Sequence, residues 1–317
     1  MSTVNMNTTS ADSVGLSPVL IALRTCFIAI IALLIISGNI LSIAVTRRVT
    51  NLADSTKILM TSLAVYDLLL GVMTLLTVVV SALDRWPFGY VCCAFYAVLI
   101  GGSFFMSILS LTYLNIERYI AVTRPYKYPV WCTRRRTILL VAVSPIICLT
   151  TETLILISDI IRAEYLSGAV ICYNTNELNY FNASSALWAY VLPLIFMLFI
   201  YYQLIKISRQ HECRLNQNVN NEANNNHNNK ALKTFLVVTL TFACCWTPLI
   251  LSRTIEMLTG ALGPNWLQFL TLWLATCNSM CNVWIYCLFN SSFRQMAKTI
   301  LSERFPCCNR SVAPVVI

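Results

Sequence analysis

The chain has 317 residues, of which 57% are hydrophobic and 11% are charged, and its formal net charge is +9. A water-soluble domain carries about 25% charged residues, so this composition excludes a soluble globule and places the chain in a lipid bilayer. Apolar stretches interrupt the basic residues, which argues against nucleic-acid binding and for a basic belt that faces membrane lipid.

Seven apolar stretches are long enough to cross a membrane as helices, which need about 20 residues each. The predicted helices cover approximately 20–46, 57–83, 90–122, 137–158, 182–208, 230–257 and 266–288. The predicted fold is an all-α membrane protein, a seven-transmembrane helix bundle over residues 20–290. Arg24 and Arg253 lie near the ends of the first and sixth helices, from which long side chains can snorkel to the headgroups.

The basic residues also predict an orientation. Eighteen of the 22 Lys and Arg residues fall on one side of the membrane if the N-terminus lies outside. The positive-inside rule then predicts an extracellular N-terminal segment, residues 1–19, and a cytoplasmic C-terminus. Residues 1–18 lack a basic region followed by a short apolar core, so we expect no cleaved signal peptide. Asn7 and Asn182 begin glycosylation sequons on outward stretches, and Asn7 is the better placed.

Two cytoplasmic segments differ from the helices in composition. Residues 209–229 hold nine Asn between 216 and 229 and both histidines, His211 and His227, which predicts a disordered linker. In residues 291–317, apolar side chains at helical spacing lie opposite basic ones, which predicts an amphipathic helix on the inner leaflet. Cys307 and Cys308 follow it as candidate palmitoylation sites, or as free thiols without a role.

Three cysteines lie where oxidation is permitted. Cys92 and Cys93 begin the third helix, and Cys172 lies in the outer loop between the fourth and fifth helices. Adjacent residues of a helix point about 100° apart, so only one of Cys92 and Cys93 can reach Cys172. The cysteines within the helices are typical of small buried hydrophobic residues.

An aspartate lies in the middle of the second helix. Asp67 stands in "LAVYDLLLG", and a charge at that depth is either a functional group or a structural carboxylate that its neighbours hydrogen-bond. Oxygen-rich groups around one carboxylate suit sodium or a proton. Polar residues at similar depth are Asn39, Ser107, Asn278, Ser279 and Asn282.

Prolines interrupt two of the predicted helices. Pro248 follows Trp246 by two residues in the sixth helix, and Pro193 lies in the fifth. Proline removes a backbone hydrogen bond and kinks a helix, so the sixth helix can act as an arm that swings. Membrane helices also carry proline without such a role.

The third helix ends in "LTYLNIERYIAVTRP", where Glu117 and Arg118 are adjacent and Tyr119 follows. An arginine at this boundary can be neutralised by its neighbour in one state and released to a partner in another. The alternative is a charge pair that marks the membrane edge.

Together these segments resemble the rhodopsin-like (class A) G-protein-coupled receptors from about residue 20 to 308. "NIERYIAV" is similar to the Asp/Glu-Arg-Tyr motif, and "SGN", "LAVYDLLLG", "WPFG" and "CCWTP" match other family motifs. Cys93 stands 25 positions before Arg118, the family's spacing for the bridging cysteine, so the resemblance implies a Cys93–Cys172 disulfide.

The resemblance implies a heterotrimeric G protein as the partner, with arrestin and a receptor kinase as further candidate partners. It also implies roles for further residues. Ile108, Pro193 and Phe242 match the trio that repacks on activation, and Tyr201 and Tyr286 match two tyrosines that meet in the active state. Asp67, Ser107, Asn278, Ser279 and Asn282 match an allosteric sodium pocket near Trp246; no other cofactor is implied. The implied location is the plasma membrane.

The chain also departs from the family pattern. Val283 replaces the proline of the seventh-helix Asn-Pro-x-x-Tyr motif, and the fourth helix lacks its usual tryptophan. Asn228 stands where some relatives carry an acid that faces Arg118. Without that acid we expect measurable basal signalling.

The resemblance places the ligand pocket at the outer end of the bundle. Amine receptors of the family carry an aspartate one turn before Phe104, where this chain has Ile100, so a peptide, a lipid or a small neutral molecule is expected. The expected pocket is mostly apolar with a polar rim. Its residues are Ile100, Phe104, Leu249, Ile250, Leu272 and Thr276, with Arg253, Glu256, Gln268 and Ser185 on the rim.

Other functions fit less well. Residues 266–288 contain no lysine, which disfavours a retinal-based light sensor. A transporter or channel would show an internal repeat and several intramembrane charges, and only Asp67 qualifies. An enzyme needs clustered His, Asp or Glu ligands within the bundle, and both histidines lie in the linker.

Overall fold

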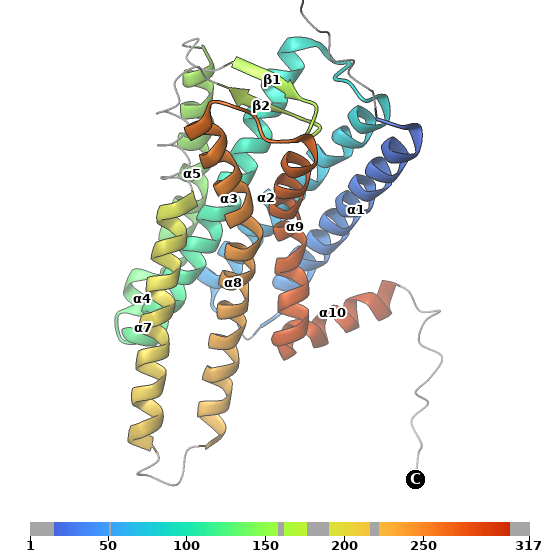
Figure 1. Ribbon diagram of the computed structural model, residues 1–317. Coiled ribbons are helices and arrows are strands. Elements are labelled where there is room, and N and C mark those ends of the chain that lie inside the picture. Colours follow the sequence, from blue (N-terminus) through green and yellow to red (C-terminus); the bar gives the residue numbers. More distant parts are fainter. Residues whose placement is uncertain (1–15, 51, 158–161, 176–189, 216–221, 305–317) are drawn as a thin grey trace, which may run out of the picture.

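The computed structural model describes residues 16–50, 52–157, 162–175, 190–215 and 222–304. Seven long helices stand side by side as a bundle (Figure 1). They are α1 (Pro18–Arg48), α2 (Asp54–Leu83), α3 (Gly89–Thr123), α5 (Arg134–Ile157), α7 (Leu192–Leu215), α8 (Glu222–Thr259) and α9 (Asn265–Phe289). The predicted seven-helix fold is confirmed.

Shorter elements mark the two ends of the bundle. At one end, β1 (Arg162–Leu166) pairs antiparallel with β2 (Ile171–Thr175), and this β-hairpin lies across the helix ends (Figure 1). We call this the hairpin end. The other end carries α4 (Tyr128–Trp131) and α10 (Ser291–Arg304), and we call it the α4 end.

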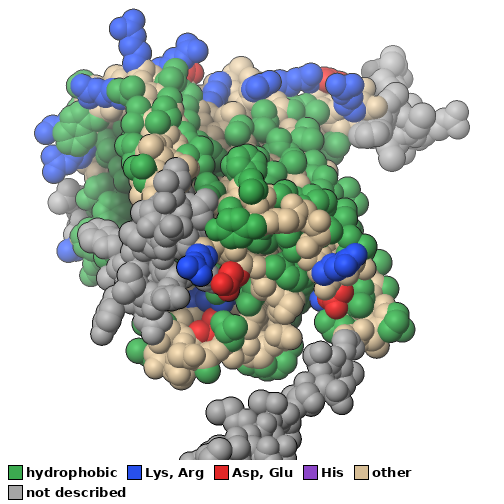
Figure 2. Space-filling model, turned by 90° about the horizontal axis from the view of Figure 1, so that it is seen from above, with side chains coloured by type: hydrophobic (Ala, Val, Ile, Leu, Met, Phe, Trp, Pro, Cys, Tyr) green, Lys and Arg blue, Asp and Glu red, His purple; other side chains and the backbone are tan. Residues whose placement is uncertain are grey.

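The outside of the bundle is apolar. Among the described residues, α1, α2, α3, α9 and the part of α8 from Leu236 to Thr259 are each long and apolar enough to cross a membrane, and Leu192–Ile207 of α7 is a shorter apolar helix. Seen from the hairpin end, hydrophobic side chains cover much of the surface, and the acidic side chains in view lie beside basic ones (Figure 2). Large apolar side chains are also exposed along the helices, among them Leu23, Leu139 and Phe199, and such sides suit a hydrocarbon environment.

The predicted amphipathic helix is present as α10. Phe293 and Ala297 are buried against the bundle, and Met296 and Ile300 pack beside them. Arg48 of α1 donates to Glu303 of α10 over 2.5 Å, so an exposed hydrogen bond connects α10 to α1.

Two predictions from the sequence need correction. The stretch 209–229 is not a linker throughout, because α7 continues to Leu215 and α8 begins at Glu222. Asparagine lowers helix propensity by a fraction of a kcal/mol per residue, about 0.7 at most, so helices already formed in the bundle can extend through it. Arg24 does not snorkel: it donates to Asp84 over 2.7 Å and to Ser81, and its side chain is only 10% exposed.

Candidate functional site: the axis of the helix bundle

The α4 end of the bundle holds a compact charge cluster. Glu117 of α3 is buried, and its carboxylate lies 3.2 Å from the Arg118 guanidinium. Thr56 of α2 joins the pair, because its hydroxyl donates to Glu117 over 2.7 Å and accepts from Arg118 over 2.9 Å. Tyr119, next in the chain, is half-buried.

Two further hydroxyls reach Glu117. Ser55 of α2 donates to it over 3.2 Å, and Tyr128 of α4 donates to the same oxygen. Burial and the hydrogen bond to Glu117 raise the pKa of Tyr128 above its ordinary value of 10.0, so the phenol keeps its proton at neutral pH. Glu117 thus accepts hydrogen bonds from three hydroxyl groups and faces one cation.

Asp67 is the second charge of the interior and is completely buried. Ser107 of α3 and Ser279 of α9 donate to one carboxylate oxygen over 2.8 and 2.7 Å, and Asn282 donates to the other over 3.1 Å. Asn278 is buried next to Ser279 in the chain, and its side-chain oxygen has no hydrogen-bond partner. The structure therefore brings Asp67 together with three of the four residues expected around it.

Asn39 of α1 extends this polar cluster. Its amide donates to the backbone oxygen of Ser279 over 3.1 Å, and to Ile35 within its own helix over 2.9 Å. The contact fixes α9 against α1 at the depth of Asp67.

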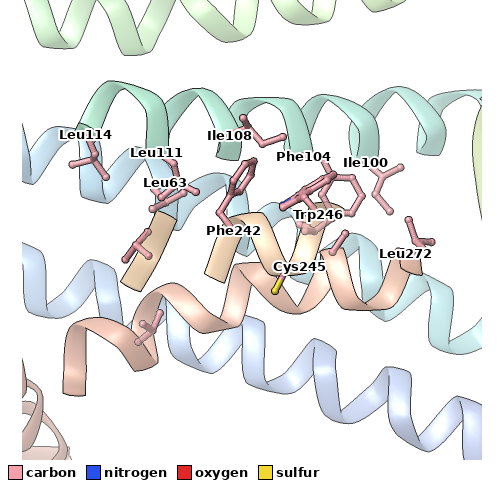
Figure 3. Packing of buried hydrophobic residues seen from close by; sticks show 14 of the residues in the cluster. Leu63, Ile100, Phe104, Ile108, Leu111, Leu114, Phe242, Cys245, Trp246 and Leu272 are labelled. Carbon is pink, nitrogen blue, oxygen red and sulfur yellow. The ribbon is translucent and has the colours of Figure 1, made fainter. Parts of the chain in front are cut away.

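An aromatic group lies between the two ends, centred on Trp246 of α8, which is 2% exposed. The Phe104 ring meets it edge-on at 5.2 Å, and the Phe242 ring lies at 5.9 Å (Figure 3). Tyr190, just before α7, stacks on it at 4.8 Å. Ile108 is buried on α3 beside Phe242, as Figure 3 shows. Pro248 and Pro193 are half-buried on α8 and α7.

Two of the expected pocket residues, Ile100 and Leu272, lie on the hairpin side of Trp246 (Figure 3). Ile100 and Phe104 of α3 and Leu272 and Thr276 of α9 are all buried. Leu249 and Ile250 of α8 are half-buried. These six residues are therefore mostly apolar or aromatic and are buried or half-buried; their role as a ligand pocket stays a prediction.

The expected rim residues are engaged with the protein itself. Arg253 donates to Glu256 over 2.7 Å and lies 5.1 Å from the centre of the Tyr173 ring of β2, so it does not snorkel. Gln268 is buried, and its amide donates to the Gly263 backbone oxygen over 2.6 Å.

The disulfide implied by the resemblance is confirmed. Cys93 of α3 is bonded to Cys172 of β2, while Cys92 is a half-buried free thiol. On α9, Tyr286 is buried and its ring lies 5.7 Å from that of Phe293, whereas Tyr201 is half-buried on α7.

Some expected sites cannot be compared with the structure. Ser185, Asn7, Asn182, Cys307 and Cys308 lie outside the described residues, and the side chain of Asn228 is also outside them.

Sequence reasoning missed the hydroxyls around Glu117 and the ring of Tyr190. Ser55 is 62 positions away from Glu117, and Thr56 is 61 positions from Glu117 and 62 from Arg118, so no local pattern connects them. One signal was available: Ser55 and Thr56 are polar residues near the start of the second helix, at the same membrane face as Glu117 near the end of the third.

A family model described as 7 transmembrane receptor (rhodopsin family) matches residues 38–286 of this chain. The chain belongs to this family. Rhodopsin-family receptors are not enzymes; they are multi-pass plasma-membrane proteins that couple to G proteins, and this chain is one of them.

Individual relatives are similar over most of their length. The chain is 30% identical to "Histamine H2 receptor" of Homo sapiens over 280 residues. This match covers 85% of the present chain and 77% of the relative. It is 31% identical over 303 residues to the protein of the same name from Canis lupus familiaris, and this match covers 88% of the chain and 78% of the relative. It is 24% identical over 290 residues to "Trace amine-associated receptor 8b" of Rattus norvegicus, and this match covers 86% of the chain and 84% of the relative.

Proposed function

We propose that this rhodopsin-family receptor binds an extracellular ligand at its hairpin end and that the ligand is not an amine. The orientation is supported by the Lys and Arg distribution, which favours a cytoplasmic α4 end. It is also supported by the Cys93–Cys172 disulfide at the hairpin end, because disulfides persist in oxidising compartments.

The identity of residue 100, an isoleucine, is the main support for a ligand that is not an amine. Its buried alkyl side chain occupies the position of the aspartate that amine receptors use as a counter-ion. A cationic ammonium placed there would lose its hydration without gaining a charge partner. The rings of Phe104, Trp246 and Tyr190 instead offer apolar and aromatic contacts, which suit a lipid, a small neutral molecule or an apolar peptide side chain.

An amine is the second candidate, because the relatives are named for histamine and trace amines. Of the described carboxylates at the hairpin end, Asp84 is paired with Arg24 and Glu256 with Arg253, while Glu164 of β1 is exposed. Glu256 lies six residues after the expected pocket residue Ile250 on α8. An amine would have to displace Arg253 from Glu256.

The route of activation starts at the pocket floor. A ligand that presses on Phe104 also shifts Trp246, and Trp246 lies two residues before Pro248, where α8 lacks a backbone hydrogen bond. Phe242 and Ile108 transmit a rotation of α8 toward the α4 end. There Arg118 leaves Glu117 and Thr56 and becomes available to the G protein.

A sodium ion fits the Asp67 cluster. The carboxylate of Asp67, the Ser107 and Ser279 hydroxyls and the unpartnered oxygen of Asn278 are hard oxygen ligands. The ion would neutralise the buried carboxylate while these residues hold α2, α3 and α9 together.

The ligand class is tested with Ile100→Asp, and Ile100→Asn serves as the uncharged control. G-protein recruitment is measured against histamine and phenylethylamine. We expect no response of the wild type or of Ile100→Asn, and a response of Ile100→Asp. A wild type that responds to either amine, and loses the response in Glu256→Gln, would establish the second candidate instead.

A further inference from the structure

A hydrogen bond connects α3 to α8 inside the bundle. The Thr239 hydroxyl of α8 donates to the Asn115 side-chain oxygen of α3 over 3.5 Å, although the two residues are 124 positions apart in the chain. Both are buried, with 1% of Thr239 and 3% of Asn115 exposed. Helices in a bilayer gain little from burying apolar surface against one another, so a polar contact of this kind contributes to how α3 and α8 are held together.

The surroundings of this hydrogen bond are apolar. Leu111 and Leu114 of α3 and Val238 of α8 belong to one hydrophobic cluster, and Figure 3 shows the two leucines on α3. The Asn115 amide N–H donates to the Leu111 backbone oxygen over 2.9 Å, which fixes the side chain while its oxygen accepts from Thr239. Loss of the Thr239 hydroxyl would deprive a buried oxygen of this hydrogen bond, which is unfavourable in an apolar interior.

The pair lies between the aromatic group and the charge cluster. Thr239 comes three residues before Phe242, whose ring lies 5.9 Å from that of Trp246. Asn115 comes three residues before Arg118. Residues three apart are neighbours on the surface of a helix, so the Thr239–Asn115 contact is one turn away from each group. A rotation of α8 that begins at Trp246 therefore strains this contact on its way to Arg118.

The sequence offers no charged restraint at position 228. Asn228 is uncharged, so it cannot form the charge pair with Arg118 that an acid forms in some relatives. A hydrogen bond between two neutral side chains in the interior differs from such a pair, because salt in the surrounding water screens it far less. The interior contact can thus restrain α8 at a different depth and by different chemistry.

We infer that Asn115 and Thr239 form a clasp, a hydrogen bond that holds α8 against α3 in the resting receptor and breaks when α8 rotates. Both are positioning residues, because they act on Arg118 through the position of α8. This inference rests on the rotation of α8 in the proposed function.

Thr239→Val tests the clasp, because valine keeps the shape of threonine and removes the hydroxyl. Agonist-free nucleotide exchange on a G protein is measured with purified full-length receptor in lipid nanodiscs. We expect a rise of about threefold, since the resting state loses one interhelical hydrogen bond that is longer than usual. Thr239→Ser retains the hydroxyl and should exchange at the wild-type rate.

Thr112→Val is the matched control on α3. Thr112 is buried three residues before Asn115, but its hydroxyl donates to the Ile108 backbone oxygen of its own helix over 2.9 Å. The same substitution there removes no described contact with α8, so exchange should stay at the wild-type rate. Poor folding lowers exchange in any variant, and a rise in Thr239→Val therefore reports a weaker resting state.

A double variant tests whether the two residues act as a unit. Asn115→Ala removes the acceptor and should also raise exchange. Because either substitution already breaks the clasp, Thr239→Val combined with Asn115→Ala should exchange no faster than the faster single variant.

Three results would overturn the clasp. The first is an exchange rate of Thr239→Val equal to that of the wild type or of Thr112→Val. The second is an equal rise in Thr239→Ser. The third is a double variant in which the two increases multiply. If Asn115→Ala does not fold, Thr239→Val and Thr239→Ser decide the matter.

The same assay separates failure of the clasp from failure of the proposed function. No ligand is added, so the results do not depend on the ligand class. Glu117→Gln is measured alongside, because it releases Arg118 directly. A rise in Glu117→Gln without a rise in Thr239→Val contradicts the clasp alone, whereas no rise in either variant contradicts both the clasp and the proposed route of activation.

Discussion

The Thr56 hydroxyl on α2 accepts a hydrogen bond of 2.9 Å from Arg118 on α3. The same hydroxyl donates to Glu117 over 2.7 Å, so one uncharged side chain holds both members of the ion pair. A movement of α3 that separates Arg118 from Thr56 also removes a proton donor from Glu117.

Thr56→Val tests this connection. Valine keeps the shape of threonine and removes both hydrogen bonds, and hydrogen bonds to charged groups are worth about 1.5–3 kcal/mol each. We expect agonist-free nucleotide exchange on the G protein to rise by roughly tenfold, because the state in which Arg118 is held loses stability.

The matched control is Thr74→Val on the same helix. Thr74 is equally buried, but its hydroxyl binds only the backbone oxygen of Leu70 in the described structure. Equal exchange rates in the two variants would mean that the Thr56 hydroxyl does not hold the resting state.

Sodium dependence tests the role of Asp67. Asp67→Asn removes the charge that attracts the cation and keeps the size of the side chain. We expect agonist affinity to change between sodium and choline solutions of equal ionic strength in the wild type, and to stay constant in the variant. Ser110→Ala, which alters a buried hydroxyl pair with Ser62, should behave as the wild type. Retention of sodium dependence in Asp67→Asn would exclude this cation site.

The disulfide gives a prediction with an adjacent control. Cys93→Ser removes the bond to Cys172 and should lower stability by about 2–5 kcal/mol, whereas Cys92→Ser should leave it nearly unchanged. Thermal unfolding with and without a reductant measures the difference. A reductant should destabilise the wild type and Cys92→Ser alike and have little effect on Cys93→Ser. A loss of stability in Cys92→Ser but not in Cys93→Ser would mean that Cys92, and not Cys93, is bonded to Cys172.

Much of the bundle could be predicted because the helices have recognisable patterns in their own local sequence. Runs of about 20 apolar residues suffice to place α1, α2 and α3, and the amphipathic spacing around Phe293 suffices for α10. The Asp67 cluster was also accessible, because a carboxylate in an apolar helix requires polar partners and few polar residues lie at its depth.

The remaining features depend on contacts between distant segments. Nothing near Asn115 in the sequence indicates its contact with Thr239, and the pairing of Arg24 with Asp84 replaces the expected snorkelling because the end of α2 comes within reach. Propensity also misled, since α8 begins at Glu222 and runs through an asparagine-rich stretch that the bundle extends as helix.

Basal activity provides a further prediction, because Asn228 stands where some relatives carry an acid facing Arg118. We expect agonist-free signalling in the wild type at the cell surface, and Asn228→Glu should reduce it by supplying a second partner for the guanidinium. Asn228→Gln, of similar size and without charge, should not. Basal signalling indistinguishable from cells without the receptor would contradict the prediction.

The measurement closest to the central claim is agonist-free nucleotide exchange on a heterotrimeric G protein by purified receptor in lipid nanodiscs. Glu117→Gln keeps the shape of the acid but removes its charge, and exchange should rise by roughly tenfold as Arg118 is released. Arg118→Ala should abolish exchange while the receptor stays folded. Exchange rates equal to the wild type in both variants would show that the Glu117–Arg118 pair does not control coupling.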